Sequence, residues 1–292
     1  MNHRARTQSL FRKLRQLPKR IVSRPEAEAI HGLRTTIRRM ETLMAATWRT
    51  PGGRERKLLK QLARMRKQAG KVRDFDVQMS ALTTLRMDSI SRDRARVMRA
   101  LEKKRSKRAR KLVAVLEDEM GSGLPKRLAR TEERLLEAAS HVQKDAHAAR
   151  DGRVVRTALD RFSAVVQKRG QLTEANLHDF RMDCKRVRYL AEVAPDSDEA
   201  QRIVAQVKRI QDAIGEWHDW VTLLASAEKV LSGSPESPLL AAVRTTMRAK
   251  FLEALHVTGE VKRTLLGMRS AAGPKAPAVV PTSIAQVRRA TA

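Results

Sequence analysis

Residues 176–190 read NLHDFRMDCKRVRYL, a segment with one histidine, four basic residues and the apolar spacing of a helix. His178, Arg181, Lys185 and Arg188 are spaced i, i+3, i+7 and i+10, so an α-helix places them on one face. The apolar residues beside that face are Leu177, Val187, Leu190 and Ala191. The pattern predicts a helix with a core face and a cationic face. The cations could face solvent, form a catalytic group or hold an anion.

The same pattern occurs once more, earlier in the chain. HGLRTTIRR at 31–39 and HDFRMDCKR at 178–186 both read His-x-x-Arg-x-x-x-basic-basic, and 147 residues separate the two histidines. Each is followed by a Gly-x-x-basic-Asp motif, GKVRD at 70–74 and GEWHD at 215–219, with 145 residues between the glycines. Two motifs in the same order at nearly equal offsets predict two related helical halves. If the cations only faced solvent, there would be no reason for the same pattern, with the histidine at the same position, to occur twice.

Helical periodicity extends over nearly the whole chain, and no β-branched run alternates long enough to indicate a sheet. The sequence therefore predicts an all-α fold of antiparallel bundles. We expect a basic N-terminal arm at 1–21 and a helical domain at 22–269, with halves at 22–165 and 170–269. An Ala- and Pro-rich tail at 270–292 is expected to be disordered. The expected helices span 25–48, 56–69, 73–88, 91–120, 125–148, 153–169, 173–193, 198–214, 217–231 and 238–269.

The charge balance points to a polyanionic partner. Lys and Arg number 61 against 32 for Asp and Glu, which gives a formal net charge of +29. Nucleic acid, an anionic membrane surface or an inorganic phosphate polymer would each neutralise such an excess. Aromatic residues make up only 3% of the chain, whereas single-stranded nucleic acid is usually held by stacking on aromatic rings. The composition favours recognition of phosphate without recognition of bases.

The sequence lacks the motifs of several other functional classes. Cys184 is the only cysteine, which excludes an intrachain disulfide and suits a reducing cytosol; we interpret it as structural. No apolar run approaches the ~20 residues that span a bilayer. No Walker loop, HExxH motif or nucleophile elbow occurs, and neither motif histidine has a partner at zinc-ligand spacing. The aspartates of the basic motifs could bind Mg²⁺, but we favour their pinning arginines and capping helices: Asp74, Asp76, Asp212 and Asp219.

Together, HGLRTTIRRM, GKVRDFDV, LHDFRMDCKRVRYL and VKRIQDAIGEWHDW resemble the motifs of the CHAD (conserved histidine α-helical domain) family, over roughly residues 22–268. The resemblance implies two pseudo-symmetric antiparallel helical bundles around a central basic channel that binds inorganic polyphosphate. Tyr189 is then expected to pack against its bundle. The Arg- and Lys-rich stretch 94–111 departs from the family's sparser pattern and is expected to extend the basic surface.

Carried over by motif, the polyphosphate-binding residues form three groups. One channel wall would comprise His31, Arg34, Arg38 and Arg39, and the other His178, Arg181, Lys185, Arg186 and Arg188. Flanking contacts would come from Lys57, Lys60, Arg64, Arg73, Arg202, Lys208, Arg209 and His218.

The function that we expect from the resemblance is non-enzymatic binding of inorganic polyphosphate, without cofactor, metal or membrane span. Its place would be the cytoplasm, on polyphosphate granules. Binding would be mainly electrostatic and would weaken steeply with salt. Two alternatives stay open: a basic protein that binds nucleic acid, and, with less support, an enzyme of polyphosphate metabolism.

Overall fold

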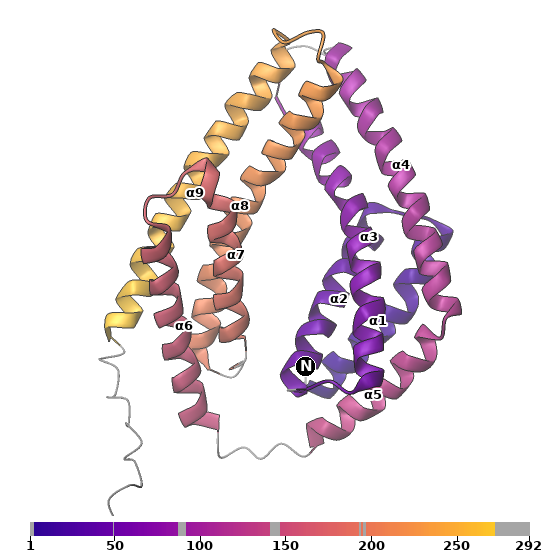
Figure 1. The fold of residues 1–292 in the computed structure, drawn as a ribbon, viewed down its shortest axis with the longest axis vertical. Helices are drawn as coiled ribbons and strands as arrows, with labels where there is room; N and C mark the ends of the chain where they lie inside the picture. Colours follow the sequence, from indigo (N-terminus) through magenta and orange to yellow (C-terminus); the bar gives the residue numbers. More distant parts are fainter. Residues whose placement is uncertain are drawn as a thin grey trace, which may run out of the picture.

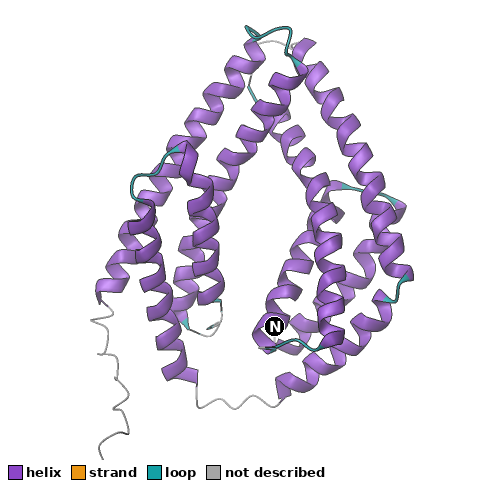
Figure 2. Ribbon diagram, viewed as in Figure 1, coloured by secondary structure: helices purple, strands orange, loops and turns teal. Residues whose placement is uncertain are grey.

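The computed structural model describes residues 3–48, 50–86, 92–140, 147–192, 194 and 197–271. All regular secondary structure in these ranges is helical (Figure 2), which confirms the predicted all-α class. None of the helices in the described ranges combines the length and the apolar character that crossing a bilayer requires.

The helices form two arms that meet at one end (Figure 1). The first arm contains α1 (His3–Ser23), α2 (Ala27–Thr47), α3 (Gly53–Thr84), α4 (Arg92–Gly121) and α5 (Leu124–Ser140). The second contains α6 (His147–Arg169), α7 (Glu174–Ala191), α8 (Asp198–Val230) and α9 (Pro238–Ala271). The long helices α3, α4, α8 and α9 reach the shared end, whereas α2 and α7 lie lower, on the inner sides of their arms.

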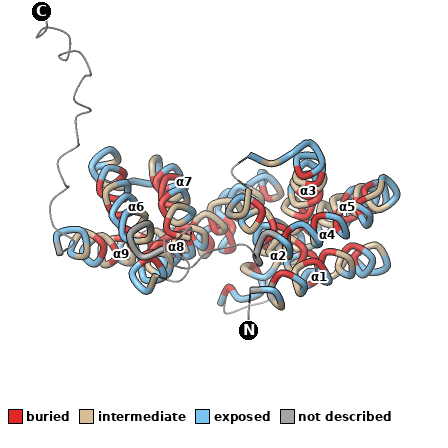
Figure 3. Tube along the Cα trace, turned by 90° about the horizontal axis from the view of Figure 1, so that it is seen from below, coloured by how far each residue is buried: buried red, intermediate tan, exposed pale blue. Residues whose placement is uncertain are grey.

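Three apolar clusters hold this arrangement. One lies within the first arm around Phe11, Ile37 and Leu62, and a second lies within the other arm around Phe162 and Phe180. A third, which we call the apical core, joins the arms through Leu82, Leu85, Val97, Leu101, Trp220, Leu223, Ala227, Leu231, Leu239, Leu240 and Val243. Figure 3 shows the buried stretches of each arm running along the inside of its own helices, with exposed stretches outside. Each arm is therefore a bundle with its own core.

The two motif glycines do not interrupt their helices, contrary to the expected breaks between 69 and 73 and between 214 and 217. α3 runs through Gly70 and α8 runs through Gly215. A glycine inside a helix costs only about 1 kcal/mol relative to alanine, which the packing of a helix of 32 or 33 residues readily offsets.

Two expected boundaries are wrong. The residues expected as an N-terminal arm at 1–21 form, from His3 onward, an amphipathic helix whose Phe11, Leu14 and Ile21 are buried in the first core. Burial of these large side chains makes α1 part of the first bundle. α6 packs into the second core, so the second bundle begins before residue 165. The expected disordered tail lies outside the described residues from 272 onward.

Candidate functional site

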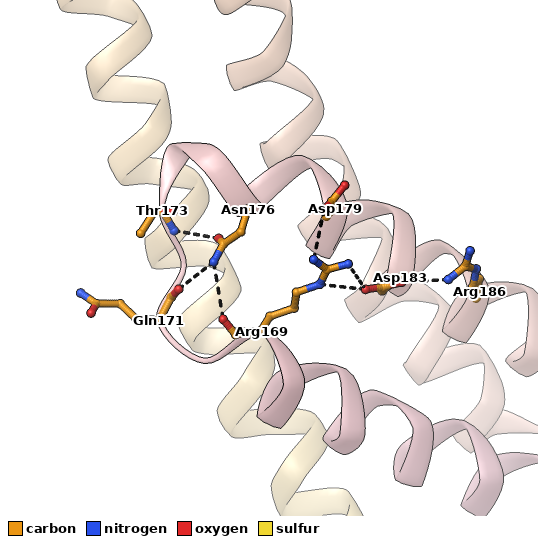
Figure 4. Close-up of polar contacts among 7 residues, drawn as sticks. All are labelled: Arg169, Gln171, Thr173, Asn176, Asp179, Asp183 and Arg186. Carbon is orange, nitrogen blue, oxygen red and sulfur yellow. Dashed lines mark hydrogen bonds and ion pairs between the residues drawn. The ribbon is translucent and has the colours of Figure 1, made fainter.

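The α6–α7 connection fixes the orientation of α7 (Figure 4). Thr173 and Asn176 form a capping box at the start of the helix, where Asn176 Oδ1 accepts a 2.9 Å hydrogen bond from the Thr173 backbone N–H. Arg169, the last residue of α6, donates to Asp183 Oδ2 at 2.9 and 2.6 Å and to Asp179 Oδ2 at 3.1 Å. The acidic flank of α7 is thereby tied to α6.

The opposite flank of α7 carries the motif cations. Arg181, Lys185 and Arg188 are half-buried, and His178 is exposed. Arg186 does not belong to this group, because its Nη1 donates to Asp183 Oδ1 at 2.9 Å on the acidic flank. The predicted stripe on α7 is therefore His178, Arg181, Lys185 and Arg188, without Arg186.

An arginine of the preceding motif lies over each motif glycine, closely at Gly215 and at an ordinary contact distance at Gly70. A Cβ on Gly215 would lie 3.1 Å from Arg181 Nη2, closer than side chains normally pack, and Arg181 Nε donates to the Gln211 carbonyl at 3.0 Å. In the first arm, a Cβ on Gly70 would lie 3.9 Å from Arg34 Cζ, and Arg34 Nη1 lies 3.8 Å from Asp74 Oδ1. At each Gly-x-x-basic-Asp motif, an arginine thus lies against the helix backbone beside the glycine; we call this position the seat of the arginine.

Cations of the two arms interact across the space between α2 and α7. Burial lowers the pKa values of Arg181 and Lys185, and the positive charge of Arg38 in the other arm lowers both further. Arg66 of α3 also lowers the pKa of Lys185. We call Arg34, Arg38, Arg66, Arg73, Arg181, Lys185 and Arg188 the central cation cluster.

Much of this charge is uncompensated. Within the described part of the chain, Arg38, Arg73, Arg181 and Lys185 form no ion pair, whereas Arg66 pairs with Glu41 and Arg188 with Glu192, each at 3.1 Å. Asp74 and Asp219 offset part of the charge of Arg73 and Arg181, but like charges held together with few counter-charges raise the energy of the free protein. An anion placed among them would relieve that repulsion.

Histidines and two further carboxylates border the cluster. The rings of His178 and His218 have centroids 5.0 Å apart, across α7 and α8. Burial lowers the pKa values of His31 and His218, so both imidazoles are neutral at pH 7 and each offers one N–H donor. Burial also raises the pKa of Asp219, to about 6, and that of Asp74. The site thus combines fixed cations, neutral donors and one carboxylate, Asp219, that loses its charge in mild acid.

The other predicted binding residues form ion pairs, line a different pocket or are exposed. Arg64 pairs with Asp118 and Glu119, Arg209 with Glu260, and Lys208 with Asp212. Arg39 lines a pocket between α1 and α2 together with Lys13 and Arg20. The remaining three are exposed on the first turns of α3 and α8: Lys57, Lys60 and Arg202.

Three side chains differ from or refine the sequence interpretation. Tyr189 is not packed into its bundle; it is 41% exposed, with Lys185 Nζ and Arg188 Cζ 5.8 and 5.4 Å from its ring centroid. Its phenol lies in polar surroundings on the cationic flank. Burial raises the pKa of the Cys184 thiol to about 12, which agrees with a structural role. Asp76 pins an arginine, since its Oδ1 accepts a 2.5 Å hydrogen bond from Arg105.

Sequence reasoning missed Arg66 and Gln211. Both precede a motif glycine by four residues, at positions that correspond under the offset of 145, so each lies one turn from its glycine. Gln211 is buried, and its Oε1 accepts a 2.6 Å hydrogen bond from Arg188. Extending the Gly-x-x-basic-Asp pattern one turn backwards would have found both residues. None of the described side chains assemble into a group of three or more potential metal ligands.

Comparison with known proteins agrees with this architecture. The CHAD domain profile matches residues 5–228. The structure resembles the crystal structure of the CHAD domain from the plant Ricinus communis, with a TM-score of 0.55 at 16% identity over 83% of this chain and 89% of that one. It also resembles PptA from Streptomyces chartreusis, with a TM-score of 0.50 at 18% identity over 92% and 96% of the two chains. No curated protein sequence matches the chain. On the extent of the profile match, the chain belongs to the CHAD domain family.

Proposed function

We propose that the central cation cluster binds inorganic polyphosphate and does so without chemical turnover. One observation carries the proposal: Arg38 of α2 is close enough to Arg181 and Lys185 of α7, in the other arm, for its charge to lower their pKa values, and none of the three forms an ion pair within the described residues. Family membership supports it, because the CHAD family is associated with polyphosphate.

The cluster has the dimensions of a site for a linear polymer. The motif residues extend ~10 Å along α2, from His31 to Arg38, and ~15 Å along α7, from His178 to Arg188, at about 1.5 Å per residue. Such a length spans several consecutive phosphates rather than one. Arginine donates in a planar fork and lysine acts as a compact charge, and both suit phosphate oxygens.

Base recognition has little support at this site. Tyr189 is the only exposed Phe, Trp or Tyr on α7, and the lysine and arginine beside it already cover part of it. Nucleic acid is the second candidate, because a net charge of +29 attracts any polyanion. A competition experiment separates the two: long-chain polyphosphate should displace bound DNA at a far lower phosphate concentration than DNA needs to displace polyphosphate.

The central test is the double substitution Arg38→Gln and Lys185→Gln. A hydrogen bond to a charged group contributes about 1.5–3 kcal/mol, so losing two should weaken the binding of short-chain polyphosphate at least ~100-fold. Lys229→Gln with Arg248→Gln removes the same charge from exposed positions outside the predicted binding residues and should have little effect. Equal affinities of the two variants would refute the site.

The absence of turnover has its own test. Incubation of the protein with long-chain polyphosphate and Mg²⁺, followed by electrophoresis of the polymer, should show an unchanged chain length. Shortening of the polymer would assign the protein to the enzymes of polyphosphate metabolism. A binding protein of this kind is expected on polyphosphate granules in the cytoplasm, which a fluorescent fusion would reveal.

A further inference from the structure

A second set of cations lies on the face of α4 that points away from the core. Six residues spaced i, i+4, i+7, i+11, i+15 and i+18 share about 80° of the helix circumference. All six are exposed, and we call them the α4 stripe: Arg92, Arg96, Arg99, Lys103, Lys107 and Arg110. Val97, Leu101 and Leu112 are buried on the opposite face. The stripe is therefore the outer surface of the helix.

The α4 stripe gathers six exposed cations in one row with few counter-charges beside them. Its only ion pair within the described residues is Arg96 with Asp93, at 3.4 Å. Some exposed cations of other helices pair with carboxylates of neighbouring helices, as Arg64 does with Asp118 and Arg209 with Glu260. Consecutive members of the stripe are three or four residues apart, a spacing at which like charges destabilise a helix. A bound polyanion would remove this repulsion.

The position of α4 separates the stripe from the central cation cluster. Figure 1 shows α4 on the outer side of the first arm; it meets α8 at the shared end, and below that end α2 and α3 lie between it and the second arm. Arg105, on the core side of α4, is engaged with Asp76 of α3 and with the Pro25 carbonyl at 2.9 Å. The two cationic surfaces therefore face different directions and can hold different chains.

The chemistry of the stripe indicates a flexible polyanion without bases. α4 contains no aromatic residue, His, Asn or Gln, so the surface offers no ring on which bases could stack and no amide for reading adenine. The stripe is straight and ~27 Å long. A strand of duplex DNA turns away within about half of its ~34 Å repeat, so it would follow only part of the stripe. A single flexible phosphate chain can follow all of it.

We propose that the α4 stripe binds a second segment of polyphosphate, so that one protein molecule joins two chains. This inference rests on the proposed function of the central cation cluster. A protein with two such surfaces cross-links long polymers and condenses them, whereas short chains occupy the two surfaces independently.

The test compares two triple substitutions of equal charge. Arg99→Gln, Lys103→Gln and Lys107→Gln neutralise the middle of the stripe, and Arg161→Gln, Lys229→Gln and Arg248→Gln neutralise exposed, unpaired cations of α6, α8 and α9. Calorimetric titration with short-chain polyphosphate measures the number of sites, and light scattering measures the condensation of long-chain polyphosphate. Circular dichroism confirms that both variants are helical.

The stripe variant should keep the tighter short-chain site within about twofold, lose the second site and lose condensation, while the control variant keeps all three. The proposal is overturned if the stripe variant condenses long chains as the control does, if its tighter site is lost, or if it loses only binding to duplex DNA. Failure of the proposed function is separate: the variant Arg38→Gln, Lys185→Gln would then retain the tighter site, whatever the stripe variant does.

Discussion

Substitution of Gly215 tests most directly whether its seat positions Arg181, and the same substitution of Gly70 is the matched control. Replacing either glycine with alanine should stabilise its helix by about 1 kcal/mol, since both lie well inside long helices. The surroundings differ. A Cβ on Gly70 meets Arg34 Cζ at an ordinary contact distance of 3.9 Å, but a Cβ on Gly215 meets Arg181 Nη2 at 3.1 Å.

For Gly215→Ala, the guanidinium of Arg181 has to move by a few tenths of an ångström, away from the carbonyl that holds its Nε at 3.0 Å. The lost hydrogen bond costs about 1.5 kcal/mol, which cancels the helix gain, so the free energy of unfolding should stay near that of the unsubstituted protein. A misplaced Arg181 should also lower the affinity for short-chain polyphosphate about tenfold, or about 1.4 kcal/mol.

Gly70→Ala should instead raise the free energy of unfolding by about 1 kcal/mol and leave the affinity unchanged. Denaturant titration and fluorescence anisotropy measure the two quantities. In an Arg181→Ala background, Gly215→Ala should regain its full stabilising effect, because the clashing group is gone. If Gly215→Ala stabilises the protein as much as Gly70→Ala and binds as tightly, the seat does not position Arg181.

Three further predictions concern single residues. Burial raises the pKa of Asp219 from 3.8 to about 6, so between these pH values the native form holds a proton that the unfolded form has released. The free energy of unfolding should therefore fall as pH rises from about 4 to about 6, and polyphosphate binding should weaken as pH rises through about 6. Asp219→Asn should flatten both pH profiles, and an unchanged profile in that variant would exclude Asp219 as their source. Cys184, with a pKa raised to about 12, should resist a thiol reagent at pH 8 until the protein unfolds, and fast labelling of the native state would contradict its burial. Asp76→Ala leaves Arg105 without its carboxylate and should cost about 3 kcal/mol in denaturant titration; a cost below about 1 kcal/mol would show that the pair adds little.

The helices and the motif faces could be predicted from the sequence because both depend on local spacing. Arg181, Lys185 and Arg188 share one face of their helix wherever that helix lies in the fold. The glycines were misread for the same reason: local rules mark Gly70 and Gly215 as breaks, whereas the close neighbour of Gly215 is Arg181, which lies 34 positions earlier on another helix. Such a contact leaves no periodic trace.

Long-range ion pairs explain the other residues that sequence reasoning misplaced. Arg64 corresponds to Arg209 by offset, and both were expected at the polymer, yet Arg64 meets Asp118 and Arg209 meets Glu260, more than 50 residues away in each case. Helix packing determines which carboxylate pairs with which cation, and the spacing of residues along the sequence does not reveal that packing. Arg38 and Lys185, by contrast, have no such partner in the described structure, and this difference became visible only once the arms were placed.

The two arms are joined mainly where α3 and α4 meet α8, at the apical core, while the cation cluster lies lower between α2 and α7. Apolar burial at one end therefore holds together two surfaces whose like charges oppose their approach. A polyanion between the arms replaces this repulsion with attraction on both sides, so its binding free energy adds directly to the stability of the joined state. The apical core thus brings the cations of the two arms together, and their combined charge favours the binding of a chain of negative charges between the arms.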